Sequence, residues 1–335
     1  MKTITALTDL PNHLEPTART AVTIGVFDGL HLGHQQLIRR TVALARKRNL
    51  KSLVMTFTGH PLELLAPPYC PKKLIYPERK ERLIERMGAD LYANLAFSSE
   101  FAAQSPENFA RDVLAGQCRA NLVVCGYDFA FGKSGAGKIP LLRELGTRLG
   151  FEVQVVNAVA ENGIHIKSTM VRDQLLSGHV EDATRMLSRP YELRGNVVPG
   201  HARGRQIGFP TANLAVDPAY IIPARGVYAC AASIHGTNNL HPAMVNIGNN
   251  PTFGENQLSI EAHILDFDGD LTGKMLSLFF LKRLRNEQKF SGVDALVRQL
   301  KADRETVNTL WGVKETGNVL TALQAWITTR NGIAD

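Results

Sequence analysis

The chain of 335 residues is 44% hydrophobic and 21% charged, a composition that excludes an intrinsically disordered protein and provides enough length for two cored domains. No apolar stretch approaches the roughly 18 residues of a membrane-spanning helix, and the first residues resemble neither a secretion signal nor a transit peptide, so we expect a cytoplasmic protein with no membrane partner. The formal charge of +7 suits nucleic acid, ATP and pyrophosphate equally well and therefore excludes none of them.

The four cysteines give no sign of a zinc or redox site. Cys70, Cys118, Cys125 and Cys230 include no pair at the two-residue separation that is typical of such sites. Cys118 and Cys125 adjoin apolar sequence, so we expect buried thiols there.

Short apolar runs alternate with helical patterns from residue 20 to about residue 157. The runs include TAVTIGVF, SLVMTF, LYANLAF, NLVVCG and FEVQVVNAV, and the helical patterns include GHQQLIRRTVALARKRNL, ERKERLIERMG and PENFARDVLAG. This alternation is typical of a Rossmann-like parallel sheet with crossover helices. Two more helical patterns at 168–178 and 179–188, with Gly178 as the stop between them, complete a first domain that we expect over residues 1–188.

The segment GVFDGLHLGH at residues 25–34 lies where the first of these strands ends and a helix begins. The carboxyl end of a strand in an α/β sheet is where ligands bind, and a helix start there can receive a phosphate. His31 and His34 are three residues apart, so both imidazoles can face a nucleotide phosphate. Each residue alone is explained as well by a turn with helix-capping histidines, and a zinc site lacks a third ligand, but the joint pattern favours a phosphate site.

This segment resembles the HxGH signature of the nucleotidyltransferase superfamily, in the form found in prokaryotic FAD synthetases. Further stretches agree: TFTGHP at 56–61, FSSEFAAQSPENFARDVL at 97–114 and CGYDFAFG at 125–132. The resemblance implies an α/β nucleotidyltransferase-like domain in which His31 and His34 are catalytic. It further implies that ATP contacts Gly25, Phe27, Asp28 and Gly33, and that Asp128 and Phe129 contact the flavin.

A second motif of that family, Ser-Ser-Thr-x-x-Arg at the start of a late helix, corresponds here to Lys167-Ser168-Thr169-Met170-Val171-Arg172. Hydroxyls and N–H groups at a helix start bind phosphate, and Arg172 lies one turn further on the same face. The resemblance implies that Lys167, Ser168 and Thr169 bind ATP phosphates and that Arg172 is catalytic. Lys167 replaces the first serine of the family, and an N-cap without a ligand explains Ser168-Thr169 equally well.

After Arg189-Pro190 the pattern changes to short strand-like runs broken by glycine and proline: ELRGNVV, GVYACAASI, AMVNIG, LSIEAHILDF and MLSLFFLKRL. These runs predict a compact antiparallel β-barrel over residues 189–335, and the helical periodicity from Ser291 to Trp326 predicts terminal helices packed against it.

The run GNVVPGHARGRQIGFPTANL near the start of this domain is rich in glycine and arginine. Its glycines permit close backbone approach and its arginines supply donors, so it is typical of a flap over phosphates, although an irregular connection with solvated arginines is equally compatible. The flap residues predicted to contact ATP phosphate are Gly200, Arg203, Gly204 and Arg205.

Oxygen donors follow this flap directly. Thr211 and Asn213 are two residues apart, so in an extended segment both side chains share a face suited to Mg²⁺ bridged to ATP phosphates. Glu261 and His263 likewise share a face, and an acidic group there can take a proton from a hydroxyl nucleophile, although a solvent-facing glutamate is the commoner explanation of such a strand.

The second half resembles riboflavin kinase. The resemblance is carried by PTAN at 210–213, GVY at 226–228, VNIGNNPTF at 245–253, IEAHILDF at 260–267 and LRNEQKF at 284–290. It implies that Thr211 and Asn213 bind Mg²⁺ and ATP phosphate, that Glu261 is the base on the riboflavin 5′-hydroxyl, and that the loop with Arg285 borders the flavin.

Together the two resemblances imply a bifunctional enzyme that phosphorylates riboflavin to FMN and adenylylates FMN to FAD, with ATP as co-substrate of both steps. Lys167 keeps open the alternative of a monofunctional riboflavin kinase with an impaired adenylyltransferase domain. A nucleic-acid-binding protein, suggested by the basic clusters at 46–48 and 72–73, is disfavoured because aromatic residues for base stacking are not interleaved with them. The pattern does not reveal an oligomeric state.

Overall fold

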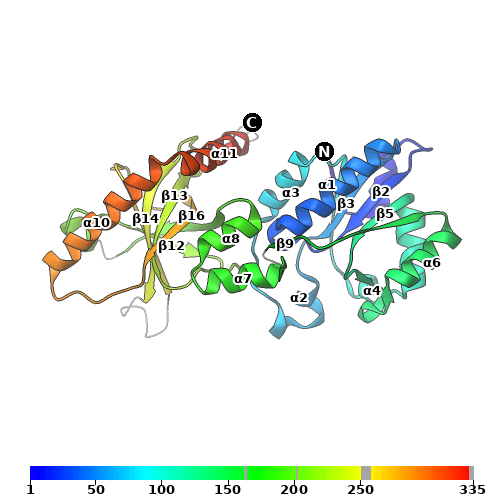
Figure 1. Ribbon diagram of the computed structural model, residues 1–335, viewed down its shortest axis with the longest axis horizontal. Helices are drawn as coiled ribbons and strands as arrows, with labels where there is room; N and C mark the ends of the chain where they lie inside the picture. Colours follow the sequence, from blue (N-terminus) through cyan, green and yellow to red (C-terminus); the bar gives the residue numbers. More distant parts are fainter. Residues whose placement is uncertain (162–163, 201–202, 250–257, 332–335) are drawn as a thin grey trace. The chain divides into compact units, whose positions relative to one another are not determined.

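The computed structural model describes residues 1–161, 164–200, 203–249 and 258–331 (Figure 1). Two compact units make up the chain, Met1–Ser168 and Thr169–Asp335. The division lies about twenty residues before the predicted boundary after residue 188, because the two helical patterns in between belong to the second unit. In the part of the chain that the structure describes, no helix combines the length and apolar character needed to cross a bilayer.

The first unit contains a parallel sheet whose strand order is β1-β4-β3-β2-β5-β8, so the predicted parallel α/β architecture is confirmed. The chain leaves the central strand β2 toward β3 and β4 and later returns to build β5 and β8 on the other side. A crevice therefore opens at the carboxyl ends of β2 and β5, the position at which α/β sheets bind ligands. The strands are β1(Lys2–Ile4), β2(Thr20–Ile24), β3(Lys51–Phe57), β4(Leu91–Leu95), β5(Ala120–Gly126) and β8(Glu152–Val156).

Helices cover both faces of this sheet. One apolar cluster joins α1 and α3 to one face, and a second joins the opposite face to η1, η4 and α6. The helical elements are η1(Leu7–His13), η2(Asp28–Leu30), α1(Leu32–Lys47), α2(Pro61–Leu65), η3(Pro67–Tyr69), α3(Pro77–Arg86), α4(Ser99–Ala102), α5(Pro106–Asn108), the π-helical η4(Phe109–Gln117), η5(Lys133–Gly135) and α6(Ile139–Leu149). Two short antiparallel pairs, β6(Ala130–Phe131) with β7(Gly137–Lys138) and β9(Ala160–Glu161) with β10(Ile164–His165), complete the unit.

The second unit contains a closed antiparallel barrel of strand order β11-β12-β15-β14-β13-β16, which closes because β16 pairs with both β13 and β11. The predicted barrel is thus confirmed. Its strands are β11(Tyr191–Val198), β12(Ala212–Val216), β13(Gly226–Ile234), β14(His241–Asn249), β15(Leu258–Ile264) and β16(Met275–Arg285).

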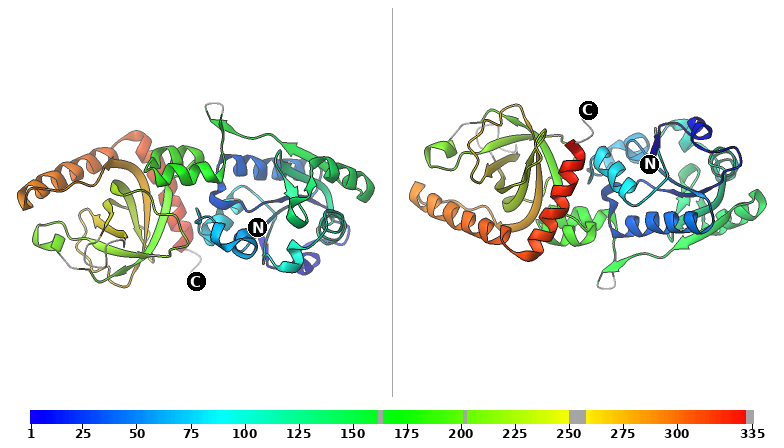
Figure 2. Two further views of the ribbon diagram at one scale, coloured as in Figure 1. Left: turned by 90° about the horizontal axis from the view of Figure 1, so that it is seen from below. Right: turned by 90° about the horizontal axis from the view of Figure 1, so that it is seen from above.

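Helices flank this barrel. The helices are α7(Ser168–Leu176), α8(Val180–Leu187), α9(Arg203–Gln206), α10(Val293–Trp311) and α11(Lys314–Asn331). Gly178, with φ of +78°, ends α7 as predicted. The buried face of α8 lies against β11 and β16, which explains why this helix belongs to the barrel unit. Figure 2 shows α10 and α11, in orange and red, along the outside of the barrel, as the terminal periodicity predicts.

Candidate active sites

A cavity of about 1190 Å³ lies in the first unit at the carboxyl ends of β2 and β5. The segments that follow these strands line the cavity. Residues of α1, several phenylalanine rings and the segment before α7 line it as well. The residues predicted for nucleotide or flavin contact that line this cavity are Gly25, Phe27, His31, Gly33, His34, Asp128, Phe129, Lys167 and Ser168.

The turn between β2 and α1 depends on three residues in the left-handed region. Phe27 has φ of 51°, Gly29 has φ of 77° and Leu30 has φ of 45°. A Cβ on Gly25 would lie 3.0 Å from the Phe27 ring, so glycine allows that ring to fold back on the strand end. Asp28 holds the turn from both sides: its carboxylate accepts from the Leu74 N–H at 3.0 Å and its carbonyl accepts from Ser168 Oγ at 2.9 Å. Asp28 thus shapes the turn instead of lining the cavity.

The two histidines of the motif lie against each other. Their ring centroids are 3.7 Å apart and the planes are inclined by 24°, while Phe27 presents its ring at 90° to His34. A Cβ on Gly33 would lie 3.1 Å from the His31 ring, so this glycine makes room for the stack. Burial, reinforced by the charges of His31 and Lys80, holds the pKa of His34 well below its usual value. His34 is therefore neutral at pH 7 and acts as a hydrogen-bonding group.

Lys80 of α3 is a buried cation that the sequence does not reveal. Its Nζ donates to the carbonyl of Val26 at 3.4 Å, to Thr56 Oγ1 at 3.4 Å and to the carbonyl of Phe57 at 3.5 Å. Burial lowers the pKa of Lys80 to about 8, although the nearby Asp28 carboxylate opposes the shift. The ammonium joins the ends of β2 and β3 directly behind the histidine turn. A lysine in a helix as charged as PERKERLIER gives no local signal of this position, because charged residues surround it in the sequence.

Phenylalanine rings form an apolar wall of the cavity. Phe57, Phe97, Phe101, Phe109, Phe129 and Phe131 line it and contact one another in sequence, with centroid separations of 5.0 to 5.9 Å. Of these residues only Phe129 was predicted from the sequence to contact a ligand. The others come from four separate segments, and only the fold brings them together.

The Lys-Ser-Thr-x-x-Arg motif divides between the two units. Lys167 is exposed and lines the cavity with Ser168. Thr169 and Arg172 lie on α7 in the second unit, and Arg172 is 9% exposed. The predicted roles of Thr169 and Arg172 in adenylyl transfer remain predictions.

In the barrel, strand register places the predicted base in a row of amides. Glu261 of β15 lies opposite Asn213 of β12 on one side and opposite Asn246 of β14 on the other. Directly opposed residues of antiparallel strands project from the same face, so the three side chains are neighbours. Asn246 was not among the predicted site residues. Its signal is its position in the stretch VNIGNNPTF.

The predicted flap packs closely on these donors. A Cβ on Gly200 would lie 1.9 Å from Asn213 Nδ2, and one on Gly204 would lie 2.1 Å from the Phe209 carbonyl and 3.7 Å from Thr211 Oγ1. Both positions therefore have no room for a side chain beside the segment PTAN, while the predicted contact of this flap with ATP phosphates stays a prediction. Arg205 is exposed, while the side chain of Arg203 lies outside the described residues.

His263 contacts the segment PTAN through the backbone of Pro210. Its Nδ1 is 2.7 Å from the carbonyl of Pro210, and since a carbonyl only accepts, Nδ1 carries the proton. Burial lowers the pKa of His263. A neutral imidazole thus holds the residue that precedes Thr211.

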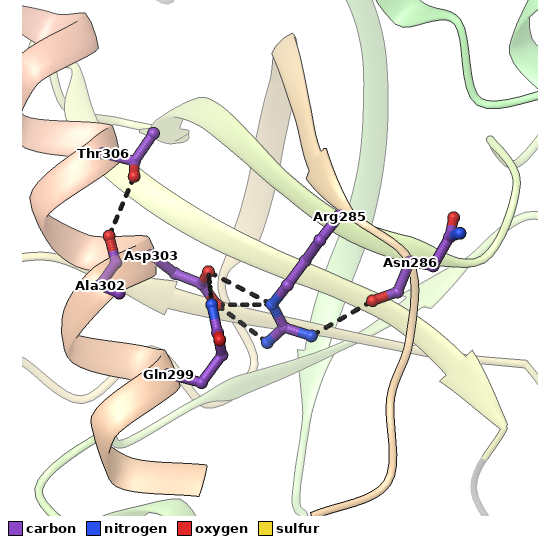
Figure 3. Close-up of polar contacts among 6 residues, drawn as sticks. All are labelled: Arg285, Asn286, Gln299, Ala302, Asp303 and Thr306. Atoms are coloured by element: carbon purple, nitrogen blue, oxygen red, sulfur yellow. Dashed lines mark hydrogen bonds and ion pairs between the residues drawn. The ribbon is translucent and has the colours of Figure 1, made fainter. Parts of the chain in front are cut away.

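Arg285 ends β16, and its guanidinium is paired with Asp303 of α10 (Figure 3). Within the described ranges no cluster of three or more histidine, cysteine or acidic side chains has the geometry to hold a metal ion. Cys118, Cys125 and Cys230 are buried free thiols, which confirms the expectation for Cys118 and Cys125.

Comparison with known proteins identifies both halves. A family model described as FAD synthetase matches residues 14–170, and one described as riboflavin kinase matches residues 187–311. A bifunctional riboflavin kinase/FMN adenylyltransferase of Bacillus subtilis is 36% identical over 302 residues, which cover 88% of this chain and 94% of the relative. The protein of the same description in Escherichia coli K12 is 36% identical over 298 residues, covering 89% and 95%.

A solved structure supports the arrangement within each unit. The crystal structure of a Streptococcus pneumoniae protein described as a macrolide-efflux protein is 34% identical, with a TM-score of 0.81, and the match covers 92% of this chain and 98% of that one. The likeness extends over both the parallel-sheet unit and the barrel.

Proposed function

Because the chain belongs to the family of bifunctional riboflavin kinases/FMN adenylyltransferases, we propose that its two reactions use two separate sets of side chains, one at the cavity of the first unit and the other in the barrel. The enzyme phosphorylates riboflavin with ATP to give FMN, and it joins FMN to the adenylyl group of a second ATP to give FAD and pyrophosphate.

We assign adenylyl transfer to the cavity of the first unit. An oxygen of the FMN phosphate attacks the α-phosphorus of ATP, the bond to the β-phosphate oxygen breaks, and pyrophosphate leaves. The phosphate is already a nucleophile, so no base is needed. The supporting observation is the position of His31 and His34 at the carboxyl end of the central strand, where a nucleotide is expected. The phenylalanine wall is the apolar surface that a flavin ring would cover.

A neutral imidazole at His34 suits this step. A neutral His34 donates one N–H to a phosphate oxygen and so stabilises the charge that develops on the departing pyrophosphate. Lys167, exposed at the cavity rim, supplies a full positive charge where the family has a serine hydroxyl. We propose that its ammonium binds the departing pyrophosphate.

We assign riboflavin phosphorylation to the row of Asn213, Glu261 and Asn246 beneath the glycine flap. Glu261 takes the proton of the riboflavin 5′-hydroxyl, whose oxygen attacks the γ-phosphorus of ATP, and ADP leaves. Such a transfer needs positioning and charge neutralisation more than covalent help. The flap glycines let backbone N–H groups approach the phosphates.

Mg²⁺ fits this row, since the Thr211 hydroxyl and the Asn213 amide oxygen are hard donors next to the predicted phosphate position. When bound, Mg²⁺ neutralises phosphate charge. A cytoplasmic location stays a prediction, supported by the use of ATP in both steps.

Two variants test the assignment. We expect Glu261→Gln to lower riboflavin phosphorylation by about 10²-fold or more and to leave FAD formation from supplied FMN unchanged, because only one step needs a base. His34→Ala is expected to do the reverse, by about 10²-fold. Both rates are measured on purified protein by chromatographic separation of riboflavin, FMN and FAD.

The outcome that contradicts the proposal is loss of both activities in either variant. Unmodified protein that converts supplied FMN to no FAD would restore the monofunctional alternative that Lys167 suggests.

A further inference from the structure

An ion pair joins the last residue of β16 to the helix that follows it (Figure 3). Arg285 Nε lies 3.2 and 3.0 Å from the two carboxylate oxygens of Asp303, and Nη2 lies 2.8 Å from Oδ2. Gln299 Nε2 donates to Asp303 Oδ1 at 2.9 Å, one turn earlier on α10. The Asp303 side chain is 5% exposed and that of Arg285 is 17% exposed, so the fork is largely removed from water.

This ion pair is not what holds α10 to the barrel. Val297, Leu300, Val307 and Leu310 of the helix already pack on Met244 and its apolar neighbours. A buried ion pair also contributes little net stability, because desolvation offsets its attraction. The role of the ion pair therefore has to be sought in the other contacts of the Arg285 guanidinium.

The rest of the guanidinium organises the loop that follows β16. Arg285 Nη1 donates to the carbonyl of Asn286 at 3.2 Å, and the guanidinium lies 5.7 Å from the ring centroid of Phe290. One side chain, held by Asp303, thus contacts both ends of the segment 286–290.

The middle of this loop reaches the row that carries the proposed base. A Cβ on Gly248 of β14 would lie 2.0 Å from Glu287 Oε1 and 3.3 Å from Asn246 Nδ2, so Glu287 occupies the space beside Asn246. Asn246 is the residue directly opposite Glu261. The chain of contacts therefore runs from Asp303 through Arg285 and the loop to the edge of the kinase site.

We propose that Asp303 is a positioning residue for riboflavin phosphorylation, which acts by fixing Arg285 and, through it, the loop 286–290 as the wall on the riboflavin side of the site. The inference rests on the assignment of phosphorylation to the Glu261 row. It gives Arg285 an indirect role, because each of its three guanidinium nitrogens already donates a hydrogen bond to the protein.

Asp303→Asn tests the proposal, since it keeps the shape and one acceptor for Gln299 but removes the charge that orients Arg285. We expect the KM for riboflavin to rise about tenfold, which corresponds to the loss of one modest binding interaction, while kcat and the KM for ATP change less than about twofold. Asp266→Asn is the matched control, because it removes the exposed partner of Arg304 on the same helix. FAD formation from FMN is the second control.

An unchanged KM for riboflavin overturns the inference. So does a fall in kcat accompanied by a higher KM for ATP and a lower melting temperature, which would reveal a merely structural role. If Asp303→Asn lowers the melting temperature, Arg285→Lys replaces it, since lysine keeps the charge without the planar fork, and the same selective rise in KM is expected. Phosphorylation that survives Glu261→Gln would instead contradict the site assignment itself.

Discussion

At the scale of single residues, burial sets the charge of the groups behind the adenylyl-transfer cavity. Burial keeps His34 neutral at pH 7 and lowers the pKa of Lys80 to about 8, so Lys80 loses its proton at mildly alkaline pH. The Lys80 ammonium donates to backbone carbonyls at the ends of β2 and β3. Among the described residues, no carboxylate lies within hydrogen-bond distance of it. The free energy of unfolding should therefore depend on pH through these groups.

Lys80 gives a prediction with a definite sign. Its pKa is about 8 in the folded chain against 10.5 in the unfolded chain, so between these values the unfolded state binds more protons. The free energy of unfolding then rises with pH across this window, by roughly 3 kcal/mol in total, an upper value for one proton. Urea unfolding at a series of pH values should show this rise in the wild type and lose it in Lys80→Met. An exposed lysine, Lys47→Met, serves as the control, and equal pH dependence in all three proteins would refute the argument.

Gly200 gives a prediction for the kinase site. A methyl group at this position would lie 1.9 Å from the Asn213 amide, so Gly200→Ala forces Asn213 out of the row that contains Glu261. We expect riboflavin phosphorylation to fall by about tenfold or more, because displacement of a positioning group by about 1 Å carries such a cost. Gly317→Ala, where no atom lies within 4 Å of the added Cβ, should leave the rate unchanged. Steady-state kinetics of FMN formation decide between them.

At the scale of elements, the alternation of apolar runs and helical patterns was sufficient to predict the parallel sheet, and the glycine-broken runs were sufficient to predict the barrel. The period of a pattern reports which face of an element is buried, but not which element covers it. The buried face of α8 could therefore be predicted, while its packing on β11 and β16 could not, and this places the helix in the barrel unit.

The sequence likewise predicts those site residues that a local turn brings together, but not those that distant elements contribute. His31, His34 and Gly33 are close in sequence, so their proximity is fixed by a local turn and was predicted. Lys80 lies behind the histidine turn and Asp303 contacts Arg285, and both belong to helices whose charged sequences look solvated, so no local signal marks them. The three-residue strand β1 was also missed, because so short a segment carries no period.

The packing of α11 gives a prediction at this scale. Trp326 is 1% exposed and packs with Leu323 and Ile327 on Ala231 and Phe279 of the barrel. Trp326→Ala should lower the free energy of unfolding of the second unit by about 3–5 kcal/mol, as removal of a large buried ring does. Val293→Ala, at a position that is 60% exposed, is the control and should change it by less than about 0.5 kcal/mol. Calorimetry of the purified proteins measures both, and equal melting curves would contradict the packing argument.

At the scale of the whole molecule, the product of one unit is the substrate of the other. The cavity of the first unit is lined by residues of that unit, and the row around Glu261 is built from strands of the second. Each set of residues is therefore able to act on substrate taken from solution.

This independence predicts how FMN travels. With labelled riboflavin, ATP and an excess of unlabelled FMN, the label in FAD should fall in proportion to the dilution of the FMN pool, because FMN is released before it is adenylylated. Isotope analysis of FAD during the first turnovers measures the ratio. Label in FAD that resists dilution would show direct transfer between the sites and contradict the prediction.

The way each sheet ends has a consequence for self-association on heating. The barrel has no outer strand among its described elements, since β16 pairs with both β11 and β13. The parallel sheet ends in β1 and β8, and an outer strand offers its unpaired N–H and C=O groups to another chain. The shortness of β1, with three residues, limits that risk on one side, whereas β8 on the other side has five residues. Strand-to-strand aggregation of this enzyme should therefore begin at β8 rather than at the barrel.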